Sequence, residues 1–205
     1  MTDALVSGLL AGYGIAVPVG AIAVLVIGLS ARSGLAVGAG AGLGAATADG
    51  LYATVAVVGG AAVAGMVRPV AGPLRWLAAA VLFALAVRTA VVAFRHHRDP
   101  QRAGPGRGLD RPGRAFLVVL ALTVLNPSTV IYFTALVLGR QAGGARSLAT
   151  SVTFVVAVFV ASASWQLLLA VGGSAVGRYL TGPRGRLATA LLSSALIAAL
   201  AAGTI

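Results

Sequence analysis

Six apolar segments, each long enough to cross a lipid bilayer, occupy most of this chain. They cover roughly residues 4–30, 36–63, 72–94, 116–138, 148–172 and 186–204. A helix needs about 20 predominantly apolar residues to span the hydrocarbon core. Charged residues make up only 9% of the chain, whereas an ordinary soluble protein has about 25%. The sequence therefore predicts an all-α membrane protein with six transmembrane helices.

The arginines indicate how these helices are oriented. The chain has 15 basic residues, all arginine, and six of them lie between Arg95 and Arg114. Cytoplasmic loops of membrane proteins carry an excess of positive charge. If the linker 95–115 is cytoplasmic, the odd-numbered loops carry 10 arginines and the even-numbered loops carry 4. We therefore expect a cytoplasmic linker and both termini outside.

The arginine excess does not by itself indicate nucleic-acid binding, because no aromatic residues that could stack on bases interleave these charges. Contact with anionic lipid headgroups is the more natural role of the linker. The chain has no cysteine, which excludes disulfides and thiolate metal sites within it. His96 and His97 lie in the linker without a third ligand nearby. We therefore predict no enzyme activity, no metal and no cofactor.

Two prolines lie inside apolar segments, in the stretches AVPVGA and LNPS. Proline removes a backbone donor and interrupts a helix, and hydrocarbon offers no water to the carbonyl that is freed. Pro18 precedes Arg32 by 14 residues, and Pro127 precedes Arg140 by 13 residues. Interrupted helices at corresponding positions of two halves are typical of transporters.

The two halves have opposite orientations if each contains three spans. We therefore predict a single transmembrane domain, 1–205, made of two inverted three-helix repeats. Repeat one covers about 1–94, and repeat two covers about 116–205.

Asp49 is the acidic residue that lies deep in an apolar segment. A charged carboxylate at mid-bilayer costs about 2.5–3.5 kcal/mol on insertion scales, so a proton, a cation, a basic partner or hydrogen bonds should compensate it. Helical spacing places Asp49 on the face of Gly38 and Gly42, with Tyr52 close to that face. Small residues four apart let helices approach closely. We expect this face, which begins at Gly34, to pack within one subunit rather than to form a dimer seam.

These features predict one polar site at the membrane midplane, between the two repeats. A desolvated carboxyl group favours its protonated form, which would let an aspartate exchange a proton near neutral pH. The alternative is a structural role, in which Asp49 caps a broken helix end and the prolines only set packing angles. The candidate residues for substrate binding or proton coupling are Asp49, Pro18, Gly20, Asn126, Pro127, Ser128 and Tyr52.

Several stretches together resemble the lysine exporter family of bacterial amino-acid exporters, the LysE/RhtB type. The segment from Gly8 to Ala21 is similar to the family's first helix, and Ser30 to Tyr52 to its glycine-rich loop and second helix. Phe116 to Phe133 is similar to its fourth helix with an Asn-Pro pair, and Trp165 with the arginines that follow fits its fifth helix. The resemblance covers nearly the whole chain.

The resemblance implies six helices in two inverted repeats, a bacterial-type inner (plasma) membrane, and export of amino acids or similar small metabolites driven by the proton gradient. It also implies a homodimer. Two positions depart from the family pattern: its Pro-Gly-Pro is here Pro18-Val19-Gly20, and its frequent lysine after Asn-Pro is here Ser128. We weigh two hypotheses, a proton-coupled exporter and a non-transporting membrane scaffold or accessory subunit with the same fold.

Overall fold

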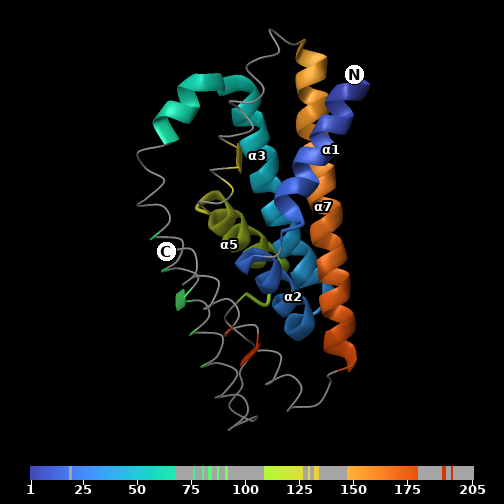
Figure 1. The fold of residues 1–205 in the computed structure, drawn as a ribbon. Helices are drawn as coiled ribbons and strands as arrows, with labels where there is room; N and C mark the ends of the chain where they lie inside the picture. Colours follow the sequence, from blue (N-terminus) through green and yellow to red (C-terminus); the bar gives the residue numbers. More distant parts are fainter. Residues whose placement is uncertain are drawn as a thin grey trace.

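The fold was analysed in a computed structural model (Figure 1). It describes residues 1–18, 20–67, 109–126 and 147–179, and single positions within 76–91, 129–133 and 191–195. Of residues 59–67 and 178–179 it describes the backbone. The predicted segments 72–94 and 186–204, the linker 95–108 and the residues Pro127 and Ser128 lie wholly or mostly outside the described residues.

Helices account for the described part of the chain, in which no strand occurs. They are α1 (Thr2–Ala16), α2 (Ala21–Ser33), α3 (Leu35–Val67), α5 (Pro112–Val124) and α7 (Leu148–Tyr179). Both α3 and α7 are long and apolar enough to cross a membrane. The pair α1 and α2, bent by 76° at Pro18, makes a third span if it is counted as one. The predicted helical membrane class is thus confirmed, whereas the set of six helices in inverted repeats stays a prediction.

The long helices α3 and α7 form the centre of the bundle, and the shorter helices pack around them. Helix α1 contacts α7 and runs beside its first half, while α2 packs against both α3 and α7 (Figure 1). Helix α5 packs mainly against α3. The helices of the two broken segments, α1, α2 and α5, therefore pack against the long helices α3 and α7.

Glycines allow the closest of these contacts. A Cβ on Gly8 would lie 2.6 Å from the Phe154 carbonyl oxygen, and one on Gly12 would lie 2.6 Å from that of Val158. Because both neighbours are backbone atoms of α7, only a residue without a side chain fits at these two positions. Helix α1 therefore meets the backbone of α7 directly.

The predicted glycine face of the second segment is used within the chain. Gly38 packs against Ser30 of α2, and a Cβ on Gly42 would lie 2.9 Å from the Cβ of Gln166 in α7. Gly34 is different, because it lies between α2 and α3 with a φ of 92° and not inside a helix. The glycine face, which was predicted to begin at Gly34, thus begins at Gly38. Gly34 instead provides the positive φ of the turn that joins α2 to α3.

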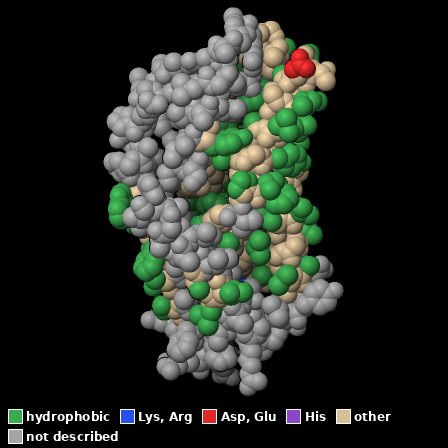
Figure 2. Space-filling model, viewed as in Figure 1, with side chains coloured by type: hydrophobic (Ala, Val, Ile, Leu, Met, Phe, Trp, Pro, Cys, Tyr) green, Lys and Arg blue, Asp and Glu red, His purple; other side chains and the backbone are tan. Residues whose placement is uncertain are grey.

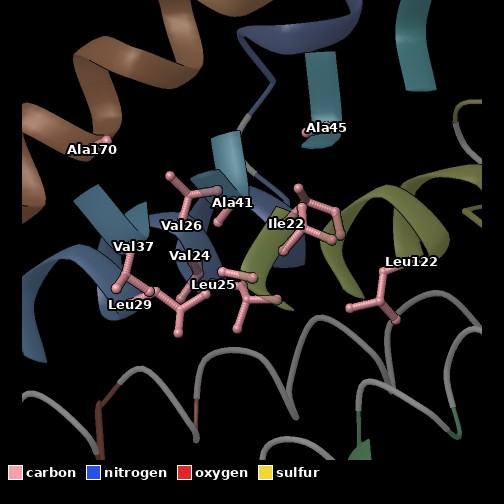
Figure 3. Packing of buried hydrophobic residues seen from close by; sticks show 12 residues of the cluster. Ile22, Val24, Leu25, Val26, Leu29, Val37, Ala41, Ala45, Leu122 and Ala170 are labelled. Atoms are coloured by element: carbon pink, nitrogen blue, oxygen red, sulfur yellow. The ribbon is translucent and has the colours of Figure 1, made fainter. Parts of the chain in front are cut away.

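Two apolar clusters divide the bundle along its length. The first, here called the α2 cluster, gathers side chains of α2, α3 and α5 with one of α7 (Figure 3): Ile22, Val24, Leu25, Val26, Leu29, Val37, Ala41, Ala45, Ala115, Val119, Leu122 and Ala170. The second, the α1 cluster, consists of Ala4, Ala11, Ala53, Ala56, Phe133, Phe154 and Val158. On α3, Asp49 lies between the two sets, and on α7 Ser162 and Gln166 do. A layer of polar side chains therefore separates the two apolar clusters.

The described outer faces of α1, α3 and α7 are apolar, as contact with lipid requires. Large hydrophobic side chains such as Leu10, Val58 and Leu168 are exposed on α1, α3 and α7. Figure 2 shows hydrophobic side chains along the described part of one face, with acidic side chains coloured only at one end.

Three loop ends lie at the same end of the bundle. The Ser33 hydroxyl at the end of α2 donates a hydrogen bond to Asp110 Oδ1, just before α5, at 3.0 Å. Gly177 near the end of α7 packs against Ala31 of α2. The first, third and fifth predicted loops would therefore begin or end on one side of the bundle, and the assignment of that side to the cytoplasm stays a prediction.

Candidate functional site

Asp49 is buried in the polar layer and bonded to α7. Its side chain is 3% exposed, and the fully buried Ser162 donates a hydrogen bond from Oγ to Asp49 Oδ2 at 2.7 Å. A hydrogen bond to a charged group contributes more than one between neutral groups, about 1.5–3 kcal/mol. The hydrogen bond from Ser162 thus offsets part of the free-energy cost of burying the Asp49 carboxyl group.

The break at Pro18 brings the N-terminus of α2 into the same layer. Helix α1 ends at Ala16, and Gly20 forms the N-cap of α2 in an extended conformation, without a side-chain cap. The first hydrogen bond within α2 runs from the Val24 N–H to the Gly20 carbonyl at 3.2 Å. The N–H groups of residues 21–23 therefore have no partner within the helix.

The second break lies at the end of α5, as the Asn-Pro pair predicts. The helix ends at Val124, and the Asn126 N–H donates to the Thr123 carbonyl at 3.1 Å. In a continuous helix residue 127 would donate to that carbonyl, but Pro127 has no N–H. The hydrogen bond from the Asn126 N–H therefore satisfies the Thr123 carbonyl, which Pro127 cannot bond.

Tyrosines bind backbone carbonyls of both broken segments. The Tyr52 hydroxyl donates to the Val124 carbonyl at 2.6 Å, and the Tyr132 hydroxyl donates to the Ala11 carbonyl at 2.9 Å. The Tyr52 ring also stacks on Phe133, with centroids 5.6 Å apart. Tyr52 was predicted to be a site residue, but in the structure it supports the end of α5 and does not line the cavity described below.

Replacing Tyr52 with phenylalanine should therefore lower stability more than it changes transport. The variant keeps the stacked ring but loses the hydrogen bond to Val124, a loss of about 1 kcal/mol. Thermal unfolding of the purified protein should show a lower midpoint, while the rate of solute transport stays close to that of the wild type. A variant of normal stability that does not transport would contradict this supporting role.

A cavity of about 70 Å³ opens between the breaks. It has room for several water molecules, since each needs about 10–15 Å³ by this measure. Its lining comes from the end of α1, the start of α2, the middles of α3 and α7, the end of α5 and two residues that follow α5: Ile15, Ala16, Pro18, Gly20, Ala21, Ile22, Ala23, Ala45, Asp49, Thr123, Asn126, Thr129 and Gln166. Four of the seven predicted residues, Asp49, Pro18, Gly20 and Asn126, thus border one space.

Other polar residues of this layer were not predicted from the sequence. Gln166 is 5% exposed, and its Oε1 is buried without a hydrogen-bond partner in the described part of the chain. Thr123 and Thr129 are also buried in the lining. Ser162 and Gln166 stand four residues apart in the stretch SASWQ, so they share a face of α7. That spacing was the available signal, but it did not reveal which helix the face meets.

Two groups of opposite polarity line the cavity. The uncapped N-terminus of α2 carries a partial positive charge of about half a unit, which favours anionic groups. Asp49 supplies a carboxyl group on the lining. Within the described ranges, no group of three His, Cys, Asp or Glu side chains that could hold a metal ion was found. The arrangement can bind a small polar molecule or exchange a proton.

Comparison with known proteins identified one family. The family model described as LysE type translocator matches residues 14–204, which is most of the chain. No curated protein and no solved structure matched the sequence in the other two comparisons.

Proposed function

We propose, from the premise that the chain belongs to the LysE type translocator family, that it exports amino acids or similar small metabolites in exchange for protons. Membership of this family makes the chain a membrane transporter rather than an enzyme. The observation that carries the proposal is the buried carboxyl group of Asp49 on the wall of a cavity between two broken helices. A scaffold has no need of the cavity.

In the proposed mechanism the proton and the solute compete for Asp49. The ionised carboxylate attracts a positively charged group of the solute, and protonation removes that attraction. On the cytoplasmic side Asp49 releases its proton and binds the solute. On the outer side a proton displaces the solute. Because each ligand excludes the other, the inward proton is coupled to the outward solute.

The apolar clusters on either side of the polar layer would act as the two barriers of this cycle. Opening the α2 cluster exposes the cavity to one side, and opening the α1 cluster exposes it to the other. Both clusters contain small residues at helix contacts, among them Ala41 and Ala45 in the first and Ala53 and Ala56 in the second. Small side chains let packed helices slide with little steric hindrance.

The driving force is adequate for accumulation outside the cell. One pH unit contributes about 1.4 kcal/mol per proton, and 100 mV contributes about 2.3 kcal/mol per charge. The sum, about 3.7 kcal/mol, corresponds to a ratio of about 500-fold for a solute of zero net charge.

We also propose that α3 and α7 are corresponding helices of two inverted repeats, with the linker 95–115 in the cytoplasm and both termini outside. They are similar in length, 33 and 32 residues, and each follows a segment broken by proline. Asp49 is residue 15 of α3, and its partner Ser162 is residue 15 of α7. This correspondence supports a pseudo-twofold axis near their hydrogen bond. A homodimer remains a proposal from the family resemblance.

Purified protein in proteoliposomes tests the function directly. Vesicles loaded with a mixture of the common amino acids would be placed under an imposed proton gradient, and the loss of each amino acid measured by mass spectrometry. Export that requires both the protein and the gradient supports the proposal. If a correctly inserted protein moves no solute under any gradient, the scaffold hypothesis gains support.

A further inference from the structure

The side-chain oxygen of Gln166 is an acceptor without a partner in the most polar part of the bundle. It is buried, it belongs to a residue that lines the cavity, and it has no hydrogen-bond partner among the residues that the structure describes. Leaving a buried acceptor unpaired costs about 1–3 kcal/mol. Leucine or methionine at this position would avoid that cost, so packing alone does not explain a glutamine.

The surroundings of Gln166 hold it at the cavity. Gly42 of α3 lies against it, since a Cβ on Gly42 would be 2.9 Å from Gln166 Cβ. Ser162, one turn earlier on α7, is bonded to Asp49. Gln166 and Asp49 thus contribute two acceptors to one lining, from neighbouring helices.

The N-terminus of α2 faces the same cavity with the opposite polarity. Gly20 and residues 21–23 belong to the lining, and Gly20, as the N-cap, has no side chain to cap this end. Backbone N–H groups at such an end bind anionic oxygens. A cavity with acceptors on one wall and uncapped donors on another matches a solute that has N–H donors and an anionic group.

We propose that Gln166 is a specificity-determining residue that contacts the solute. Its side-chain oxygen accepts a hydrogen bond from an N–H donor of the solute, while the first turn of α2 binds the anionic group. The inference rests on the proposed function, because it takes the cavity to be the solute site.

Binding measurements without any gradient test this assignment. Purified full-length protein would be heated with each common amino acid, with its N-trimethylated analogue, which has no N–H donor, and with its carboxamide, which has no anionic group. The wild type should be stabilised most by the unmodified amino acid. Equal stabilisation by the trimethylated analogue would overturn the role of the acceptor, and equal stabilisation by the carboxamide would overturn that of α2.

Variants of Gln166 then test whether its side-chain oxygen is the acceptor. Gln166→Met keeps the size of the side chain but has no carboxamide oxygen, so affinity for the amino acid should fall about 10- to 100-fold. Binding of the trimethylated analogue should not change. Gln166→Glu retains an acceptor and should keep the preference for N–H. Thr153→Val, at an exposed site of α7 whose hydroxyl bonds the Ala149 carbonyl, is the matched control and should bind as the wild type does.

The outcomes separate this inference from the proposed function. A Gln166→Met variant that binds the amino acid as tightly as the wild type overturns the inference even if export is observed. If no amino acid stabilises the wild type, the inference is also overturned. Binding that depends on Gln166, without proton-driven export from vesicles, instead refutes the exchange mechanism alone.

Discussion

Replacing Asp49 with asparagine is expected to abolish proton-driven export in a protein that remains folded. Asparagine has nearly the same shape and can still accept the hydrogen bond from Ser162, but it cannot bind and release a proton. The wild type can sustain a solute ratio of about 500-fold at full coupling, whereas vesicles with the variant should lose amino acid no faster than vesicles without protein. Mass spectrometry of the vesicle contents measures this loss.

Asp3→Asn is the matched control, because it makes the same chemical change at an exposed residue near the N-terminus. It should export as the wild type does. The thermal unfolding midpoint of both variants should remain near that of the wild type, which separates loss of coupling from loss of fold. An Asp49→Asn protein that still exports when the proton gradient is applied, and stops when it is removed, would refute Asp49 as the proton carrier.

Gly12→Ala is expected to cause a large loss of stability. The added Cβ would lie 2.6 Å from the Val158 carbonyl oxygen and 2.7 Å from Ala161 Cβ. A backbone oxygen cannot move without shifting α7, so α1 and α7 must separate. Overpacking of this kind costs about 1–3 kcal/mol, and we expect the upper end of that range. Thermal unfolding of the purified protein measures the change.

Gly172→Ala provides the opposite case on α7. Nothing lies within 4 Å of a Cβ at Gly172, so the substitution removes a poor helix former without a clash. It should leave stability unchanged or raise it by up to about 1 kcal/mol. If Gly12→Ala proves as stable as Gly172→Ala, the close contact of α1 with α7 is not what holds them together.

Much of the local structure could be predicted from the sequence because its causes are local. Hydropathy depends on each segment's own side chains, and it identified apolar stretches that lie within α3 and α7. Proline interrupts a helix through its own missing N–H and its ring, which is why the breaks at Pro18 and before Pro127 were predictable. The burial of Asp49 followed from its depth in an apolar segment. The partner of Tyr52 was not predictable, because its distance from Asp49 along the helix does not show which carbonyl its hydroxyl reaches.

The sequence by itself determined the membrane class, the broken helices and the buried carboxyl group, since each depends on residues close together in the chain. Only the tertiary structure decided what meets Asp49: Ser162 is 113 residues away, and Gln166 lies beyond it on the same helix. It also decided that Gly34 makes a turn while Gly38 and Gly42 make contacts. An isolated helix presents all its faces to its surroundings, so only packing against other helices selects the face that lines the cavity.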